Sequence, residues 1–574
     1  PREKASDPED DSAWCRWLKS EVFWRYKERS GATSFRDRIW RDSLSKSGIA
    51  SSLVKGAVLR KCALDPNAKV DGGAGIIPSA SPHDGSSEPP LIGADWLIQK
   101  GAGVPSTKSD LRLSRECVRL GLPNREWRES CVNFNYDVSR TYPRVLFVPR
   151  SLSDAQLGIV SAFRSKSRFP VLSWLHRNGA PLCRCAKPLP GPEGAESSGD
   201  DVLLHAILAA AMARNHAANL QLVACEARRP VALFSDDDGG GYESLVHLND
   251  SKWGKQAGRV HLSFMDIEDI STMRSAYHQV LVACSSAPID GGEYDLRGAV
   301  DESGWFTHLS LILQGAEFIA RELDAGNAVV VHCSDGSDRT AQLSALAQIL
   351  IDPFSRTVAG FAGLVDREWS TFGYRFTERH SQSRDTDKKT HDTAASPIFL
   401  QFLDAVWQLT VQFPSHFEFS EHYLVCVADA VFFGYFANFH GNCERDRRSL
   451  FQLCARRQSL VDAWTYLQAQ VYTRDAIEAR NYLYDESTLF KHAPIWPNTG
   501  AKGLQLWEGW FLRHSLIRWH QRRIFTLRCK SRRIRELMLR RTPQSFPKLP
   551  KRIEDQYGAS VLIQRWLRRL EKAA

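Results

Sequence analysis

The chain has 574 residues, of which 43% are hydrophobic, and it carries a formal net charge of +9. That length is enough for roughly two to four domains, and the apolar content supports a large core, which excludes a wholly disordered or fibrous protein. Its 13 cysteines are scattered rather than paired at metal-ligand spacing. This pattern argues against a zinc module, and it favours a reducing, cytoplasmic compartment over secretion.

The N-terminal part of the sequence divides in two by composition. Residues 1–64 mix charged and aromatic side chains with weak helix and strand signals, so we treat them as a separate N-terminal region. Residues 65–117 open with a stretch rich in Gly, Pro, Ser and Ala, and we predict a low-complexity linker there. The sequence begins at Pro1 without a Met, and we expect it to be a piece of a longer chain.

Four apolar segments farther along the chain predict buried elements. The Ala-rich run at 202–223 predicts one helix, residues 328–331 predict a short buried strand, and residues 341–351 predict a helix after it. The nearly continuous apolar run at 423–439 is similar to a membrane span. It contains Asp429 and is shorter than the roughly 20 residues that a span needs, so we predict a buried helix instead.

The run HCSDGSDRT, residues 332–340, lies between the predicted strand and helix. A strand, a tight loop and a helix bring backbone N–H groups together at a helix N-terminus, where they bind anions. Cys333 and Arg339 are separated by five residues, which puts a thiol at the floor of this cradle and a guanidinium over it. We expect His332 to orient the loop. A buried structural Cys beside a glycine turn is the alternative, and the complete strand–loop–helix pattern disfavours it.

The chemistry that follows from this loop is phosphoryl transfer through a thiol. A thiol at a helix N-terminus beside an arginine is deprotonated more readily than a free one, so we predict Cys333 as the nucleophile that attacks phosphorus. Arg339 would bind the phosphate and stabilise the charge of the transition state. Thr340 can hydrogen-bond the thiolate. Asp338, and after it Asp335, are the candidates for protonating the leaving oxygen. No metal or cofactor is needed for this reaction.

The C-terminal residues 501–574 predict a basic, amphipathic helical tail. From Arg513 onward there are 18 Lys and Arg against 4 Asp and Glu, so the tail supplies all of the net positive charge. Such a helix suits an anionic membrane at about 1 kcal/mol per basic residue, or a calmodulin-like protein, or solvent alone. Residues 561–569 are similar to an IQ motif, with Arg569 where the motif has Gly. The aromatics follow no nucleic-acid-binding module, so we expect no nucleic acid as partner.

The loop and its surroundings resemble the myotubularin family, which consists of phosphoinositide 3-phosphatases within the cysteine-phosphatase superfamily. The family loop reads CSDGWDRT and this one reads CSDGSDRT. The resemblance continues in TYPRVLFVPRSL, FRSKSRFPVLSW, GGGYES, FAGLVDREWSTFGYRFTERH and SPIFLQFLDAVWQLTVQFPSHFEFSEHYL, in the family's order, over roughly residues 118–445. The cations of FRSKSRF, which are Arg164, Lys166 and Arg168, can either reach a phosphate or form structural ion pairs.

Three departures from the family pattern affect the expected substrate pocket. Ser337 replaces the loop tryptophan and removes a large apolar side chain from the rim. The family's DARP segment reads EARRP from Glu226, followed by carboxylates at 236–238 instead of asparagines. Asp269 stands where the family has Asn. These extra carboxylates would repel an anionic inositol phosphate if they faced it.

The resemblance implies an α/β fold with a central sheet flanked by helices, and a phosphatase domain over residues 118–500. Family members carry a lipid-binding PH-GRAM domain ahead of it, of which residues 1–64 would be a reduced remnant. The implied reaction is hydrolysis of the 3-phosphate of phosphatidylinositol 3-phosphate or the 3,5-bisphosphate. The implied setting is cytoplasmic and peripheral on endosomal or other internal membranes, with a homo- or heterodimer within the family. We expect the substrate to be bound by Ser334, Gly336, Ser337, Thr340 and Asp269.

Three other functions stay open at this point. One is a membrane- or calmodulin-binding module built on the basic tail, with a vestigial enzyme, and deletion of residues 510–574 would test it. A protein tyrosine or dual-specificity phosphatase would share the Cys and the Arg, and turnover of a phosphopeptide would distinguish it. A catalytically weak or inactive adaptor is motivated by the altered substrate segments, although the intact Cys333 and Arg339 argue against it.

Overall fold

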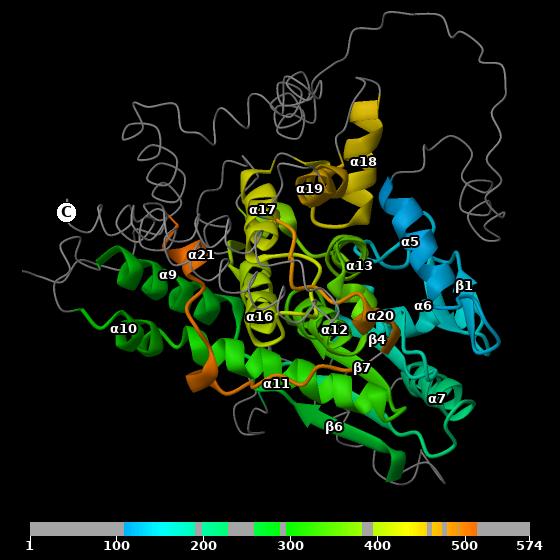
Figure 1. Cartoon of the computed structure of the whole chain (residues 1–574). Helices are drawn as coiled ribbons and strands as arrows, with labels where there is room; N and C mark the ends of the chain where they lie inside the picture. Colours follow the sequence, from blue (N-terminus) through cyan, green and yellow to red (C-terminus); the bar gives the residue numbers. More distant parts are fainter. Residues whose placement is uncertain are drawn as a thin grey trace, which may run out of the picture. The chain divides into compact units, whose positions relative to one another are not determined.

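The computed structural model describes residues 108–189, 198–227, 258–286, 294–380, 394–455 apart from 435, 462–472, 479–491 and 493–513 (Figure 1). The chain divides into two compact units, one of residues 1–283 and 296–505 and the other of residues 284–295 and 506–574. The candidate loop belongs to the first unit. The predictions for 1–64, most of 65–117, 236–244 and 514–574 lie outside the described residues.

The first unit is built on a seven-stranded mixed sheet in the order β1-β2-β3-β4-β7-β5-β6. Strands β1 to β4 pair antiparallel with one another, whereas β4, β7, β5 and β6 run parallel. Parallel strands need long crossover connections, and helices form the β4–β5 and β6–β7 connections in the part of the chain that the structure describes. The strands are β1 (Trp127–Ser130), β2 (Leu146–Pro149), β3 (Val171–Leu175), β4 (Pro181–Ala186), β5 (Leu220–Ala224), β6 (Val260–Phe264) and β7 (Ala328–Cys333).

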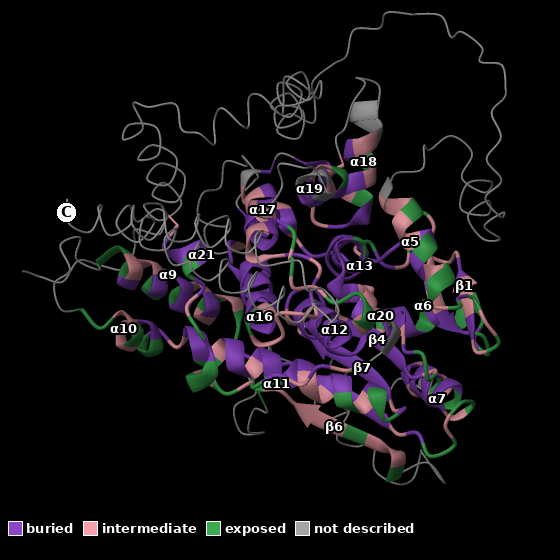
Figure 2. Cartoon of the chain, viewed as in Figure 1, coloured by how far each residue is buried: buried purple, intermediate pink, exposed green. Residues whose placement is uncertain are grey.

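Strand β7 lies between β4 and β5, and every one of its residues is buried. A strand covered on both faces reads as a continuous apolar run, as AVVV does here. Helix α7 (Ser198–Met212) packs on one face in a core cluster with Leu222 and Val330. Helices α11 (Trp305–Asp324) and α12 (Arg339–Ile351) pack on each other and contact β7. In Figure 2, α12 is buried along its length. The predicted α/β sheet flanked by helices is therefore confirmed.

The other helices extend the layer around α12 or connect the strands. They are α5 (Lys108–Arg119), α6 (Asp154–Ala162), α9 (Ile270–Ser286), α10 (Leu296–Glu302), α13 (Val358–Val365), α14 (Phe376–Arg379), α16 (Ile398–Gln412), α17 (Glu421–Phe433), α18 (Glu444–Ala455), α19 (Ala463–Tyr472) and α20 (Ser487–Lys491). Short helical turns are η1 (Ser165–Ser167), η5 (Pro353–Arg356), η6 (Asp366–Thr371), η7 (Ala437–Phe439) and η8 (Ala501–Gly503). The second unit contains α21 (Glu508–Phe511).

Most of the predicted apolar elements are confirmed, and one needs correction. The strand over 328–331 and the helix over 341–351 are β7 and α12. The run at 202–223 is not one helix: α7 ends at Met212, and Leu220–Ala224 form strand β5. The break falls at Arg214-Asn215, where the Asn215 Nδ2 bonds backbone carbonyls near the start of β7 and the chain turns back into the sheet. Alanine periodicity alone does not mark such a turn.

The apolar run at 423–439 forms helix α17 and a turn. The helix ends at Gly434, whose φ of 57° is a left-handed conformation that terminates helices. Among the described residues no helix is long and apolar enough to span a membrane.

Helix α5 occupies the last part of the segment that composition places in the linker. The helix is amphipathic, but it is so rich in charged side chains that its overall composition does not distinguish it from a linker. Charge anchors it instead: Arg112 pairs with Asp366 at 2.8 Å and with Asp462 at 2.7 Å, and Arg119 pairs with Asp352 at 2.6 Å. The folded part therefore begins at least ten residues before position 118.

Candidate active site

The loop between β7 and α12 brings Cys333 and Arg339 to the carboxyl edge of the parallel strands. Cys333 is the last residue of β7, and its side chain is 2% exposed. Arg339 is the first residue of α12, and Asp338 stands at the N-cap position before it. Ligand sites in open α/β sheets form at this edge, and a helix N-terminus adds its unpaired N–H groups.

Buried arginines hold the loop from behind at Gly336. The Gly336 carbonyl accepts hydrogen bonds from Arg168 Nη2 at 2.8 Å and Arg184 Nη2 at 3.0 Å. Arg184 is fully buried and pairs with the equally buried Glu368 at 2.8 Å. Gly336 has a φ of +69°, and a Cβ there would lie 2.4 Å from the Cys185 carbonyl oxygen. Only glycine allows this close approach, so the neighbouring strand and the two arginines fix the path of the loop.

One carboxylate connects the two ends of the loop. Glu226 Oε1 accepts from the Ser334 backbone N–H at 2.8 Å and from Arg339 Nη2 at 2.7 Å. Arg339 Nη1 also donates to the Ile267 carbonyl at 2.9 Å. These bonds orient the guanidinium, and they show that N–H groups of the loop donate to an anionic oxygen. Glu226 opens the EARRP segment, and sequence reasoning did not assign it a role in the site.

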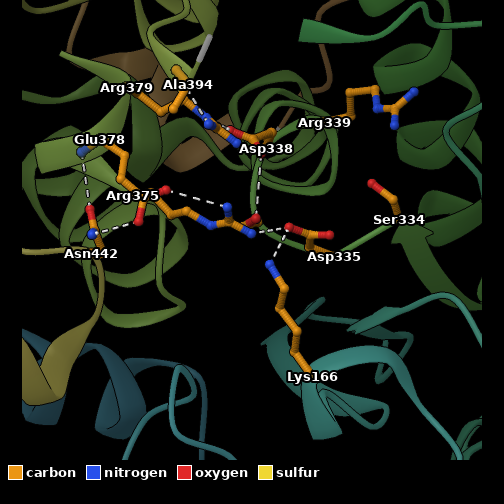
Figure 3. Close-up of polar contacts among 12 residues, drawn as sticks. Lys166, Ser334, Asp335, Asp338, Arg339, Arg375, Glu378, Arg379, Ala394 and Asn442 are labelled. Atoms are coloured by element: carbon orange, nitrogen blue, oxygen red, sulfur yellow. Dashed lines mark hydrogen bonds and ion pairs between the residues drawn. The ribbon is translucent and has the colours of Figure 1, made fainter. Parts of the chain in front are cut away.

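The open side of the loop carries a charged network around Asp335 (Figure 3). Asp335 Oδ2 accepts from Lys166 Nζ at 2.7 Å and from Arg375 Nη2, while Arg375 also pairs with Glu378 at 3.3 Å. Partial burial works to raise the pKa of Asp335, but the charges of Arg375 and Lys166 outweigh it and lower that pKa. The network places two cations from distant segments beside the loop.

Asp338 has a more buried partner. Arg379 donates to both of its carboxylate oxygens, with Nε and Nη2 each 2.8 Å away, and its Nη1 donates to the Ala394 carbonyl at 2.9 Å (Figure 3). Burial works to raise the pKa of Asp338, but the Arg379 charge and hydrogen bonds lower it. Both acid candidates are therefore ionised in the resting site.

The remaining loop residues line its inner side. Burial and the charge of Arg164 lower the pKa of His332 to about 3, so its imidazole is neutral and suited to a structural role. Ser337 is buried, and its hydroxyl lies 3.4 Å from Asp338 Oδ2. Thr340 is fully buried at the start of α12. Ser337 is thus buried, not at the rim where the sequence predicts it.

Asp269 lies outside the loop and caps a helix. Its Oδ1 accepts from the Thr272 backbone N–H at 2.9 Å, immediately before α9 begins at Ile270. Partial burial opposes the charged form, but hydrogen bonds from Thr272 and the charge of Arg339 lower the pKa of Asp269. The Asp269 carboxylate therefore caps helix α9 and also lies close enough to Arg339 to be stabilised by its charge.

The three cations of FRSKSRF have different partners. Arg164 is buried and pairs with Asp200 through Nε at 2.8 Å, and Arg168 supports Gly336. Lys166 alone of the three pairs with a loop side chain. Its φ of 53° is a left-handed conformation that is uncommon for a side chain of this kind. In the described part of the chain, no cluster of three His, Cys, Asp or Glu residues is placed to hold a metal ion.

Comparison with known proteins agrees with this geometry. The family model of the myotubularin-like phosphatase domain matches residues 101–448. The chain belongs to the myotubularin family. It is 35% identical over 412 residues to myotubularin of Xenopus tropicalis, which covers 71% of this chain and 62% of that protein.

Two further relatives carry names that state a reaction. Phosphatidylinositol-3,5-bisphosphate 3-phosphatase MTMR2 of Bos taurus is 34% identical over 419 residues, with 71% of this chain and 58% of that protein covered. The protein of the same activity name, MTMR6 of Homo sapiens, is 35% identical over 402 residues, with 70% and 60% covered. This family member therefore spans about three fifths of the length of the curated relatives that it matches.

Sequence reasoning found the loop and missed most of its neighbours. Glu226, Arg375 and Arg379 contact loop residues but lie between 40 and 113 positions away in the chain. Their segments resemble the family sequence, and this resemblance is the one feature of the sequence that points to them. Charged residues in such blocks are as often structural as functional, so composition could not select these three.

Proposed function

We propose that this chain is a phosphoinositide 3-phosphatase that hydrolyses the 3-phosphate of phosphatidylinositol 3-phosphate or the 3,5-bisphosphate. The observation that carries the proposal is the placement of Cys333 and Arg339 at the two ends of one loop at a helix N-terminus. The relatives' names, which state this reaction, support the substrate class. The family membership of residues 101–448 supports the reaction type.

The first step is attack of the Cys333 thiolate on phosphorus. The S–P bond forms as the P–O bond to the inositol ring breaks, and the product is a phosphocysteine. Arg339 and the loop N–H groups bind the phosphoryl oxygens and stabilise their developing charge. The leaving oxygen takes a proton and departs as the inositol hydroxyl.

Asp338 is our first candidate for that proton donor, and Asp335 is the second. Both carry lowered pKa values because cations face them. A substrate phosphate competes for Arg379, Arg375 and Lys166, and its negative charge favours protonation of the released carboxyl. Asp338 is more buried than Asp335, so the loss of its cation raises its proton affinity more.

The second step is hydrolysis of the phosphocysteine. The carboxylate left by the first step accepts a proton from a water molecule, whose oxygen attacks phosphorus as the S–P bond breaks. Thr340, buried at the start of α12, is proposed to donate a hydrogen bond to the departing thiolate. Inorganic phosphate then leaves and the enzyme is regenerated.

The cations beside the loop favour a substrate with more than one phosphate. Arg339 suffices for the reacting phosphate, whereas Lys166 and Arg375 share the single carboxylate of Asp335 on the open side. A second phosphate can displace Asp335 and gain two charge-assisted hydrogen bonds. We therefore propose the bisphosphate as the preferred substrate, with Ser334, Gly336 and Ser337 contributing loop N–H groups and Asp269 restricting the rim.

A lipid substrate implies that the enzyme acts at a membrane surface. We propose peripheral association with endosomal or other internal membranes on the cytoplasmic side, where thiols stay reduced. A dimer within the family and a calmodulin-like partner for the tail remain predictions, and the tail lies outside the described residues.

The first test is phosphate release from short-chain phosphatidylinositol 3-phosphate, the 3,5-bisphosphate and a phosphotyrosine peptide. We expect release from the lipids that disappears in Cys333→Ser and persists in Cys185→Ser, a buried cysteine on the neighbouring strand. Release from the peptide alone would favour the protein phosphatase. No release from any of them by folded protein would overturn the enzyme and favour the adaptor, which the Ser337 replacement motivates.

A further inference from the structure

A second cysteine lies beside Cys333 on the adjacent strand. Strands β5 and β7 are parallel and in register, with Ala224 opposite His332 as their last pair. Cys225 and Cys333 follow one residue later, and the Cys225 N–H donates to the His332 carbonyl at 2.9 Å. Because side chains alternate in step along both strands, the two cysteines face the same side of the sheet.

Their separation is compatible with a disulfide. Neighbouring strands lie about 4.8 Å apart, and a disulfide joins cysteines whose Cα atoms are roughly 4.4 to 6.8 Å apart. Cys225 Sγ is 4.0 Å from Thr340 Oγ1, at the base of the loop that Cys333 opens. The structure therefore holds a second thiol directly behind the loop.

Cys225 has no part in the proposed phosphoryl transfer. It is fully buried, and burial together with the negative charge of Cys333 raises its pKa well above that of an ordinary thiol. It is thus a neutral thiol that does not compete for phosphorus.

Cys185 provides an internal comparison. It is equally buried on β4, on the other side of β7, with His332 as its register partner. It belongs to the core cluster on the face that α7 covers, together with Val330. Cys333 is three positions after Val330 and faces the opposite side, so Cys185 points away from it.

We propose that Cys225 is a resolving thiol that traps peroxide-oxidised Cys333 as a disulfide. The inference rests on the proposed role of Cys333 as a reactive thiolate. The thiolate attacks one oxygen of hydrogen peroxide, so that an S–O bond forms as the O–O bond breaks, and the departing hydroxide takes up a proton and leaves as water. Cys333 is now a sulfenic acid, oxidised by two electrons, and the peroxide has been reduced.

In the second step Cys225 sulfur attacks the Cys333 sulfur. The S–S bond forms, the S–O bond breaks, and the proton of Cys225 leaves with the hydroxide as a second water. The disulfide removes the nucleophile and stops turnover, yet a dithiol restores both thiols. It also protects Cys333 from the sulfinic and sulfonic acids, which a dithiol does not reduce.

The test treats the full chain with hydrogen peroxide and maps its peptides without reduction by mass spectrometry. Wild-type protein is expected to yield a Cys225–Cys333 linked peptide that is lighter than the two free peptides by two hydrogen atoms. Oxidised Cys333 that is never linked to Cys225 would overturn the inference and leave the phosphatase proposal standing. A Cys333 that resists peroxide would instead count against the thiolate itself and so against both.

Variants sharpen the same measurement. Cys225→Ser and Cys225→Ala are expected to convert Cys333 to sulfinic and sulfonic acids, and a dithiol should then recover less than about a tenth of the activity. Cys185→Ser should form the disulfide and recover like wild type. Equal recovery in all three variants would contradict the role of Cys225, and the wild-type peptide map decides the matter if a Cys225 variant does not fold.

Discussion

Ion pairs hold both the inner side and the open side of the Cys333–Arg339 loop, but the inner pairs are buried and the outer ones are partly exposed. On the inner side, Gly336 is held by Arg184, whose pair with Glu368 is fully buried. On the open side, Asp335 is held by Lys166, and both side chains are partly exposed, at 24% and 44%. The inner pairs cannot exchange their partners for water, whereas the outer ones can.

Because of this difference in burial, we expect the two sides to have different roles. A buried ion pair that cannot be replaced by solvent fixes geometry, and breaking it leaves an uncompensated charge. A partly exposed pair contributes little stability, so an incoming phosphate can replace the carboxylate at small cost. We therefore propose that the inner side shapes the loop and that the open side selects the ligand. Variants on each side should show separate effects on folding, turnover and substrate affinity.

The largest expected effect is on turnover, when Arg339 is replaced. Arg339→Lys keeps the charge but loses the paired N–H groups that grip two phosphoryl oxygens. We expect kcat for the lipid to fall by roughly a thousandfold, with a small change in the unfolding free energy. Arg375→Lys is the matched control, and its kcat should stay within about tenfold of wild type. Equal losses of kcat in both variants would mean that the paired N–H groups of Arg339 have no specific role in turnover.

Substitutions on the inner side should lower the stability of the protein. Arg184→Met removes the nearer of two cations from the buried Glu368, which keeps Arg367 at 3.3 Å, and it leaves Gly336 with one donor fewer. We therefore expect the unfolding free energy to fall by about 3 kcal/mol. Arg214→Met removes a partly exposed partner of Glu126 and should cost less than about 1 kcal/mol. Chemical denaturation measures both. A loss at Arg184 no greater than at Arg214 would remove the distinction between the two sides.

Substitutions on the open side should weaken substrate binding. Arg375→Gln removes one of two cations offered to a second phosphate, which corresponds to about 10- to 100-fold in KM for the 3,5-bisphosphate. The KM for the 3-monophosphate should change less, and kcat for both should be nearly unchanged. Steady-state kinetics with the two lipids decide this. The same rise in KM for both lipids would place Arg375 on the reacting phosphate instead.

The smallest expected effect is in the pH dependence of stability. The folded-state pKa values of Asp335, Asp338 and Glu368 lie below their ordinary values, because cations outweigh burial at each. Their contribution is therefore complete above the unfolded pKa of about 4 and is lost as pH falls through the folded pKa, at about 1 kcal/mol per unit of depression. Asp338→Asn should flatten this loss in denaturation curves taken at decreasing pH. An unchanged slope would show that Arg379 does not depress the pKa of Asp338.

The loop was predictable because its parts are contiguous. The apolar strand, the Cys, Gly and Arg at fixed spacing, and the apolar helix all lie within residues 328–351, so local patterns suffice. Helix α5 and strand β5 were not, because α5 is dominated by charged residues next to a low-complexity segment and β5 is a fully buried strand inside an Ala-rich run. Glu226 and Arg379 reach the loop only through the fold, and no spacing in the sequence reports such a contact.

The most direct test of the central claim is a search for the covalent intermediate. Protein mixed with the 3,5-bisphosphate is quenched in acid within a turnover, digested, and analysed by mass spectrometry. The mechanism predicts phosphate on Cys333 during turnover, and none in Arg339→Ala or without substrate. Turnover of the lipid with no phosphate on Cys333 at any quench time, or with phosphate on another residue, would contradict it.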